Sequence, residues 1–358
     1  MRVGIVGLPQ CGKTAVFNAL TGAHGDMGVY HAAERLSLGV VSVPDDRLDA
    51  LAQMLSPKET VAATIEFEDI GGVFSHLAGG ERSGQAVAAL RDCDAMAMVV
   101  RCFEAPSVFE ILGEVDPLRE YNALNQELLL ADLEVIEKRL DAIERDVRKP
   151  VPERDALKQE QVVLEQCRLA VEQEEGLRAV QMTGPEQKML RSYAFLTLKP
   201  RLCILNVGEG QVASPPVPDE FKGLDPPPVP MCAKLEMELM DLEEEDRAAF
   251  LADGGLMEMA SGKVIRASYD VLGLRSFFTH VSDKLRAWTI QGGTDAKGAA
   301  GKIHTDMEKG FIRAEVVGFA DLAEAGSIKE ARARGKVRME GKDYEVRDGD
   351  VITFHFSR

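Results

Sequence analysis

Long apolar runs and aromatic residues are scarce in this sequence. Aromatic side chains account for 6% of the 358 residues, and there is a single Trp. The apolar stretch 95–100 ends at Arg101, whereas a membrane-spanning helix needs about 20 consecutive apolar residues. Residues 1–6 are too short for the apolar core of a signal peptide. We therefore expect a cytoplasmic protein with no membrane partner.

Paired cysteine motifs and a surplus of basic charge are also missing. The six cysteines include no Cys-x-x-Cys pair, which favours reduced thiols over a disulfide framework. The formal net charge of −17 argues against a surface that binds nucleic acid as a whole, and we expect no DNA partner. Residues 276–358 are nearly balanced, with 14 Lys and Arg against 13 Asp and Glu. Any contact with a polyanion should be a local patch in this part.

Strand-like runs alternate with helical segments through much of the chain. The apolar, β-branched runs lie at 3–6, 39–43, 64–70, 95–100 and 201–205. The alternation predicts an α/β fold with a doubly wound, mostly parallel sheet. The proline-rich stretch 211–230 predicts a surface loop.

Two parts of the chain differ from this pattern. Residues 122–190 are rich in Glu, Gln, Leu, Ala, Arg and Lys and are broken by Pro150 and Pro152. They predict an inserted helical hairpin, or else two ordinary helices packed on the sheet. From 276 onward, short β-like runs alternate with turn residues. We therefore expect an α/β domain at 1–275 and a small β-rich domain at 276–358.

The most informative motif is Gly7-Leu8-Pro9-Gln10-Cys11-Gly12-Lys13-Thr14. It follows a predicted strand and precedes a predicted helix, which is the context that a phosphate-binding P-loop requires. Its glycines let the chain curl so that backbone N–H groups face phosphate oxygens, and Lys13 places a charge on the β- and γ-phosphates. The Thr14 hydroxyl ligates Mg²⁺. Nucleotide binding is assigned to Gln10, Cys11, Gly12, Lys13, Thr14 and Ala15.

A second magnesium ligand is expected at the end of another strand. Asp69 ends the run 64–70 and begins an Asp-x-x-Gly pattern that closes at Gly72. The Gly72 N–H can approach a γ-phosphate and move away after hydrolysis. We assign Mg²⁺ to Thr14 and Asp69, and catalysis to Lys13, Asp69 and Gly72. An ordinary strand-terminal Asp is the alternative.

The base-binding segment is expected after the strand 201–205. Guanine-specific P-loop proteins carry Asn-Lys-x-Asp there, and this chain has Asn206-Val207-Gly208-Glu209. The Lys is absent, and the longer arm of Glu loses the two-pronged geometry for guanine, so adenine becomes feasible. We expect Asn206, Val207 and Glu209 to line the base pocket and the preference for guanine to weaken. A plain turn, and GTP, are the alternatives.

Several strings together resemble one known family. The strings Gly4-Ile5-Val6-Gly7-Leu8-Pro9 and Phe17-Asn18-Ala19-Leu20-Thr21 are similar to Obg-related P-loop NTPases. The chain further resembles the YchF or Obg-like ATPase family at 44–49, 100–104, 195–200, 206–209, 286–289 and 303–315. The resemblance covers nearly the whole chain and is most specific near its C-terminal end.

This resemblance implies an Obg-type nucleotide-binding domain with the helical hairpin inserted, followed by a C-terminal TGS domain of the ubiquitin-like β-grasp type. It also implies binding of ATP in preference to GTP, and slow hydrolysis that works as a switch. It further implies association with the ribosome, through its large subunit or RNA, in translation or stress control. We expect a monomer.

Three positions depart from the family pattern. Ala33 stands where members carry a Mg²⁺-ligating Thr, and Glu110 stands where many carry a His suggested to assist hydrolysis. Val73 follows Gly72 in place of a water-orienting Gln. Because the binding parts are kept and the hydrolytic parts are altered, we expect a slow ATPase. A nucleotide-binding scaffold with little hydrolysis is the alternative.

Two further features leave alternatives open. Cys11 lies inside the phosphate loop, where its thiol is either a small packing residue or a redox-sensitive brake. The basic residues of the C-terminal part are either an RNA-contacting patch or a solvated face; they are Lys297, Lys302, Lys309 and Arg313.

Overall fold

The computed structural model describes residues 1–22, 36–71, 73–74, 83–104, 113–148 and 154–357. The chain forms two compact units. The N-terminal unit comprises Met1–Gly39 and Phe67–Ser261, and the C-terminal unit comprises Val40–Glu66 and Gly262–Arg358. The expected domain boundary between residues 275 and 276 stays a prediction. The sequence did not predict that residues 40–66 pack with the C-terminal part of the chain, as they do in the structure.

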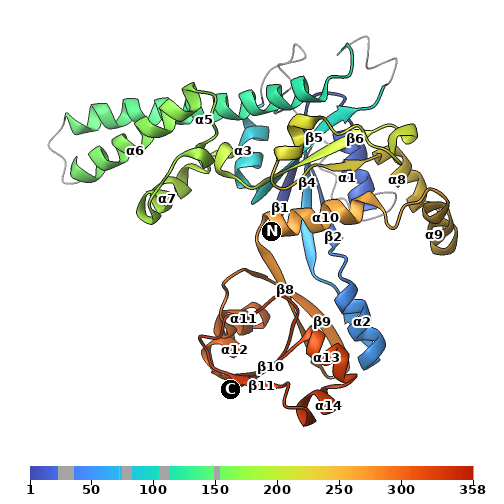
Figure 1. Cartoon of the computed structure of the whole chain (residues 1–358). Coiled ribbons are helices and arrows are strands. Elements are labelled where there is room, and N and C mark those ends of the chain that lie inside the picture. The colour runs from blue at the N-terminus through green and yellow to red at the C-terminus, as the bar shows by residue number, and fades with distance from the viewer. Residues whose placement is uncertain (23–35, 72, 75–82, 105–112, 149–153, 358) are drawn as a thin grey trace. The chain divides into compact units, whose positions relative to one another are not determined.

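The first sheet has six strands in the order β2-β4-β1-β5-β6-β7 (Figure 1). In chain order they are β1 (Arg2–Gly7), β2 (Leu36–Ser42), β4 (Thr64–Ile70), β5 (Ala95–Cys102), β6 (Arg201–Val207) and β7 (Val229–Met231). The pairs β1–β5, β5–β6 and β6–β7 are parallel. Every residue of β5 is buried, as expected for a central strand covered on both faces. The predicted doubly wound α/β fold is confirmed.

The prediction of a surface loop over 211–230 is wrong at its end. Val229–Met231 is the edge strand β7, and Phe221 is buried in edge-on contact with Tyr121. Pro230 is compatible with this position because an edge strand needs no ladder hydrogen bond from every residue. A three-residue strand is too short to show an alternating pattern, so the proline content dominated the sequence prediction.

The inserted hairpin consists of α5 (Pro117–Val147) and α6 (Arg154–Glu172). The first half of α5 packs into the sheet core through Tyr121, Leu124 and Leu128. Its second half forms a separate apolar cluster with α6, the short helix α7 (Gly184–Leu190) and the segment that follows. This second core favours the hairpin over two helices packed on the sheet. The hairpin begins at Pro117, five residues before the expected start, and Asp116 caps its first helix.

A buried carboxylate on α5 connects the hairpin to the rest of the N-terminal unit. Asp132 of α5 is fully buried, and its oxygens accept the N–H groups of Leu196 and Thr197 at 2.8 Å each. Arg91, the last basic residue of α3 (Gly84–Asp92), lies 3.4 Å from the same carboxylate. Burial raises the pKa of Asp132, while these donors act against that change.

The second sheet has the strand order β11-β10-β12-β8-β9-β3. Its strands are β3 (Glu59–Val61), β8 (Leu274–Val281), β9 (Lys284–Gln291), β10 (Phe311–Gly318), β11 (Arg338–Glu340) and β12 (Asp350–Phe356). β8 and β9 form an antiparallel hairpin, β12 joins β8 in parallel, and α11 (Ala296–Ile303) packs into the core of this unit. This is the expected β-grasp arrangement. One of the β-like runs expected after residue 276, at 344–346, is not a strand, because Glu345 makes only an isolated bridge to Asp295.

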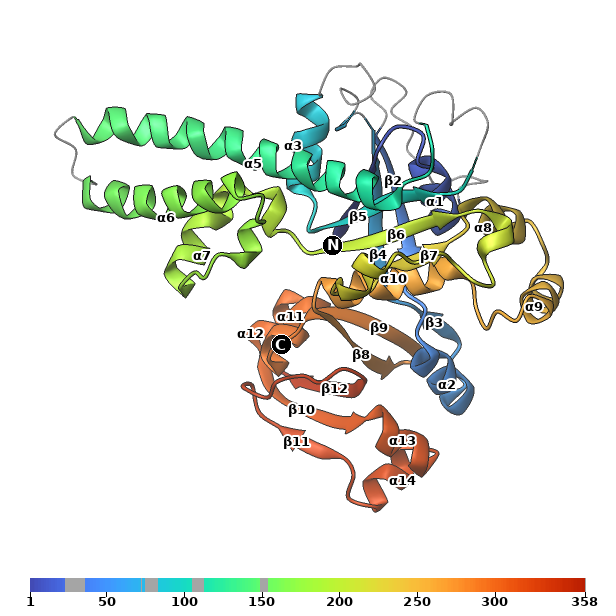
Figure 2. The same cartoon turned by 45° about the horizontal axis from the view of Figure 1, so that its top comes forward.

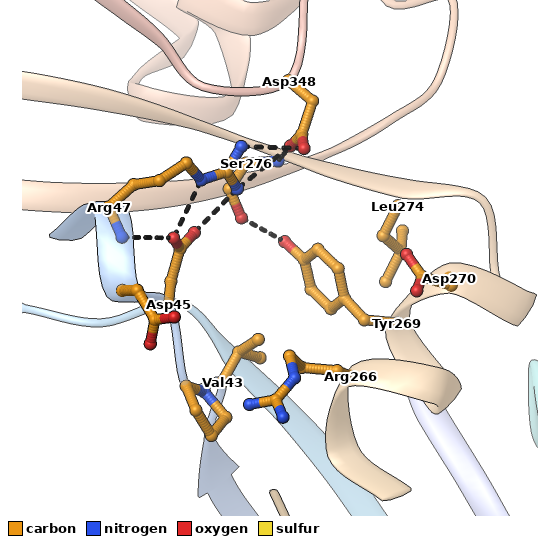
Figure 3. Close-up of a pocket in the computed structure, with 11 residues that line it drawn as sticks. Val43, Asp45, Arg47, Arg266, Tyr269, Asp270, Leu274, Ser276 and Asp348 are labelled. Carbon is orange, nitrogen blue, oxygen red and sulfur yellow. Dashed lines mark hydrogen bonds and ion pairs between the residues drawn. The ribbon is translucent and has the colours of Figure 1, made fainter. Parts of the chain in front are cut away.

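The family string 44–49 has a structural role in the C-terminal unit. Asp45 caps α2 (Asp46–Leu55) and binds the Arg47 guanidinium, which also reaches Asp348 at 2.8 Å (Figure 3). Asp348 in turn accepts the Ser276 N–H at 2.8 Å. These contacts join α2 to the second sheet beside a cavity of about 270 Å³.

Besides α1 (Lys13–Thr21), six further α-helices lie in the described residues: α8 (Ala233–Met240), α9 (Glu244–Asp253), α10 (Ala260–Val271), α12 (Thr305–Lys309), α13 (Phe319–Ala325) and α14 (Ile328–Ala333). Within the described ranges, no helix combines the length and apolar character needed to span a bilayer.

Candidate nucleotide-binding site

The P-loop connects the end of β1 to α1 (Lys13–Thr21). Gly12 has a φ of 91° just before the helix, and a Cβ there would lie 2.2 Å from Asn206 Nδ2. A Cβ on Gly7 would lie 2.5 Å from both Cys11 Sγ and the Val99 carbonyl oxygen. Both motif glycines are therefore required by close approach, and Gly12 also by its left-handed backbone.

Lys13 lies over the loop that precedes it. Its Nζ donates to the carbonyl oxygens of Gly7 and Leu8 at 3.0 Å each. The positive charge is thus already placed at the start of α1, where the helix dipole also favours an anion. Gln10 is exposed with a φ of 63°, and Ala15 lies in the first turn of α1.

Thr14 and Asp69 are brought together, although 55 positions separate them in the sequence. The exposed Thr14 donates from Oγ1 to Asp69 Oδ2 at 2.8 Å. Asp69 is 8% exposed, and its Oδ1 is buried without a hydrogen-bond partner among the described residues. Burial raises the pKa of Asp69, while Thr14 and Lys13 lower it.

The unpaired Oδ1 makes the pair suitable for a hard cation. Mg²⁺ prefers oxygen ligands and usually takes one or two from the protein, with phosphates and waters filling the rest. The described residues contain no group of three or more His, Cys, Asp or Glu side chains that could hold a metal alone. A site of this kind therefore fits a magnesium nucleotide better than a free metal ion.

Cys11 is completely buried beneath the loop. Burial raises the pKa of its thiol to about 11, and the nearby Lys13 charge only partly opposes that change. The thiol is protonated at neutral pH and packs against Gly7. This environment favours the packing role over the redox brake.

Asn206 connects the phosphate loop to the base-binding segment. Its Nδ2 donates to the Cys11 carbonyl oxygen at 3.0 Å, and its Oδ1 accepts the Ala233 N–H at 3.2 Å. Both ends of the buried amide are therefore already bonded. Val207 is likewise buried, at the end of β6. That these two residues line the base pocket stays a prediction, and their observed contacts serve to hold the loops together.

Glu209 lies at the surface of the same segment. Its Oε1 is 2.7 Å from Lys234 Nζ, and this contact raises the pKa of Lys234. The predicted base-binding carboxylate is therefore exposed and paired with a lysine on α8.

Phe103 is a site residue that the motif analysis did not single out. Its ring atom Cε1 lies 3.8 Å from the position of a Cβ on Gly12, and its Cβ lies 3.8 Å from that of Gly208. The residue thus lies close to both loops of the site. Its place in the string 100–104, directly after β5, was the available signal.

Three of the residues singled out in the sequence, Gly72, Ala33 and Glu110, lie outside the described residues. Val73 is 2% exposed and packs in the core of the N-terminal unit. It therefore places an apolar side chain immediately after the Asp-x-x-Gly pattern.

Comparison with known proteins agrees with this geometry. A family model described as "50S ribosome-binding GTPase" matches residues 2–138, and the YchF-GTPase_C model, described as "Protein of unknown function (DUF933)", matches residues 274–357. The Ribosome-binding ATPase YchF of Bacillus subtilis is 38% identical over 100% of this chain and 99% of its own length. The Escherichia coli O157:H7 protein of the same name is 39% identical over 99% of each chain.

The chain belongs to the YchF family. A solved structure, that of the Schizosaccharomyces pombe YchF GTPase, superimposes with a TM-score of 0.85 at 29% identity and covers 99% of this chain and 97% of its own. YchF membership agrees with the P-loop NTPase fold and with the β-grasp sheet of the C-terminal unit. It extends over both units, so the resemblance seen in the sequence strings is confirmed.

Proposed function

We propose that this YchF protein binds ATP with Mg²⁺, hydrolyses it slowly and uses the nucleotide as a switch on the ribosome. The observation that carries the proposal is the Thr14–Asp69 pair beside Lys13, with one buried carboxylate oxygen unpaired. Relatives of full-length similarity are named ribosome-binding ATPases.

The residues of this chain divide the work at the phosphate end. The loop N–H groups and Lys13 bind the β- and γ-phosphates, and Lys13 must leave the Gly7 and Leu8 carbonyl oxygens to do so. Thr14 and Asp69 would hold Mg²⁺, which when bound neutralises phosphate charge. Asp69 Oδ1 would be the oxygen available to the ion, because Oδ2 already accepts the hydrogen bond from Thr14. Gly72 is proposed to sense the γ-phosphate.

ATP is proposed in preference to GTP because, among the described residues, the carboxylate expected at the base end is already paired. Glu209 is engaged by Lys234, and Asn206 has both amide ends bonded. Dissociation constants for MgATP and MgGTP, measured side by side by calorimetry, test this assignment. A clear preference for GTP would establish the alternative, a GTPase of the same fold.

Hydrolysis is proposed to be slow because an apolar side chain, Val73, follows the Asp-x-x-Gly pattern. Efficient P-loop hydrolases place a polar residue there to orient the attacking water. Single-turnover hydrolysis with and without ribosomes measures the rate. No cleavage under either condition would favour the nucleotide-binding scaffold.

Ribosome association is proposed through the C-terminal unit. Lys297 and Lys302 of α11, Lys309 of α12 and Arg313 of β10 are all exposed, as a contact with RNA phosphates requires. Co-sedimentation with ribosomes at increasing salt concentration tests this contact. A bound fraction that does not fall as the salt concentration rises would contradict it. A monomeric, cytoplasmic protein completes the proposal, and sedimentation velocity of the purified chain measures the oligomeric state.

A further inference from the structure

Helix α9 (Glu244–Asp253) has ten residues, and none of them is buried. In two views it lies at the rim of the N-terminal unit, beyond α8 and away from the sheet (Figures 1 and 2). Helices shorter than about 12 residues are marginal in water, and most protein helices are stabilised by packing an apolar face. Within the described part of the chain, α9 has no such buried face.

The segment that carries α9 is nevertheless fixed at its base. Glu236 of α8 is 6% exposed, and its two carboxylate oxygens accept the N–H groups of Ala260 and Ser261 at 2.6 and 3.2 Å. These two residues begin α10, so one side chain holds both ends of the stretch 241–259 together. The stretch is therefore presented as a defined projection, which lowers the entropy cost of binding.

Large apolar side chains are exposed along this projection. Leu242, Phe250 and Met257 are 39%, 46% and 100% exposed. Leu242 and Met257 flank α9 in the sequence, and Phe250 lies on the helix itself. Phe250 is therefore an exposed aromatic side chain on a helix that has no buried face among the described residues. Aromatic residues such as Phe250 commonly supply the binding energy at protein interfaces.

The charge of the projection selects its partner. Residues 241–258 contain seven Asp or Glu and a single basic residue, Arg247. Such a segment is repelled by nucleic acid phosphates and attracted to a basic surface. The C-terminal unit differs in composition, because residues 276–358 hold 14 Lys and Arg against 13 Asp and Glu.

We infer that residues 241–258, the acidic arm, dock on a strongly basic protein surface with an apolar pocket for Phe250. The inference rests on the proposed ribosome association, because ribosomal proteins are basic proteins that such a switch would meet. It assigns protein contact to the acidic arm and leaves RNA contact to the C-terminal unit.

The test uses the full chain and two probes, the RNA-free protein fraction of purified ribosomes and protein-free ribosomal RNA. Binding of each is measured by fluorescence anisotropy. The unaltered chain should bind the protein fraction, Phe250→Ala should weaken that binding about tenfold, and E244K/E245K/D246K should weaken it at least as much. The matched control D155K/E172K/E175K makes the same charge change at exposed positions elsewhere and should bind as the unaltered chain does.

Several outcomes would overturn the inference. They are variants of the acidic arm that bind the protein fraction normally, an unaltered chain that binds no protein in it, or a photo-cross-linker at position 250 that attaches to RNA, to a second copy or to the chain's own C-terminal unit. All variants should keep their MgATP affinity, because the altered side chains are exposed and lie outside the nucleotide site.

The same variants separate this inference from the proposed function. If E244K/E245K/D246K co-sediments with intact ribosomes as well as the unaltered chain does, ribosome association stands and docking through the acidic arm is wrong. If the unaltered chain binds the isolated proteins through the acidic arm but never co-sediments with ribosomes, the arm stands and the proposed association is wrong.

Discussion

The two ends of the nucleotide site differ in what holds them in place. At the phosphate end, backbone geometry dominates, because Gly7 and Gly12 leave no room for a Cβ. At the base end, side chains dominate: Asn206 spans two loops, and Glu209 is paired at the surface with Lys234. The phosphate end should therefore tolerate almost no change, whereas the base end should be adjustable at its exposed rim.

The largest effect is expected from Lys13→Ala, which removes the charge from the phosphate loop. Charge-assisted hydrogen bonds contribute about 1.5–3 kcal/mol each, so MgATP affinity should fall at least about 100-fold. Calorimetric titration measures it. The exposed Lys188 provides the control Lys188→Ala, which should bind normally. Nearly normal affinity in Lys13→Ala would mean that the loop amides alone hold the phosphates.

Asp69→Asn should lower the Mg²⁺-dependent single-turnover rate about 100-fold, because a neutral amide is a poor ligand for Mg²⁺. It should also raise the melting temperature of the nucleotide-free protein. The pKa of Asp69 is raised by burial, so the folded state binds the proton more tightly than the unfolded state does.

That difference fixes the sign of the pH dependence. Between the ordinary pKa of Asp and the raised value in the fold, the contribution of Asp69 to stability decreases as pH rises. Thermal melts of the nucleotide-free protein across acidic pH should lose this component in Asp69→Asn. A lower melting temperature in the variant would contradict the interpretation of a buried, incompletely paired carboxylate.

Asn206→Ala tests whether the two ends are coupled. It removes two buried hydrogen bonds and leaves the Cys11 carbonyl oxygen and the Ala233 N–H without partners, which costs about 2–4 kcal/mol of unfolding free energy. Because Cys11 belongs to the phosphate loop, MgATP affinity should fall about tenfold. Urea denaturation and calorimetry measure the two effects. Loss of stability with unchanged affinity would show that the ends are independent.

The smallest effect is expected at the exposed rim of the base end. Lys234→Ala removes a surface ion pair, and such pairs contribute little, so MgATP affinity should change less than about threefold. Glu209→Asp should shift the preference toward GTP by several-fold, because the shorter carboxylate approaches guanine-binding geometry. Competition of GTP against labelled ATP measures both. An unchanged preference in Glu209→Asp would remove Glu209 from the base pocket.

The β7 edge strand and Phe103 show where sequence reasoning stopped. β7 has only three residues and contains Pro230, so neither periodicity nor composition marks it as a strand. Phe103 matters because its neighbours in space, Gly12 and Gly208, come from distant parts of the chain. β7 has no local signal, and the string 100–104 contains Phe103 without showing which residues it meets, because that depends on which segments the fold brings together.

Local chemistry by itself determined the phosphate loop, the alternating α/β pattern and the helical character of residues 122–190, because loop glycines, Lys13 and helical periodicity act within a few residues. The separate apolar core of the hairpin came from the structure. Only the tertiary structure showed that Thr14 donates directly to Asp69 and that Asn206 bonds both the Cys11 carbonyl oxygen and the Ala233 N–H. It also showed that residues 40–66 pack with the C-terminal part of the chain. The structure further showed that α9 has no buried residue and that Glu236, before α9, accepts the N–H of Ala260, after it. The physical reason is that pairing and burial depend on distances between segments, which the order of residues along the chain does not state.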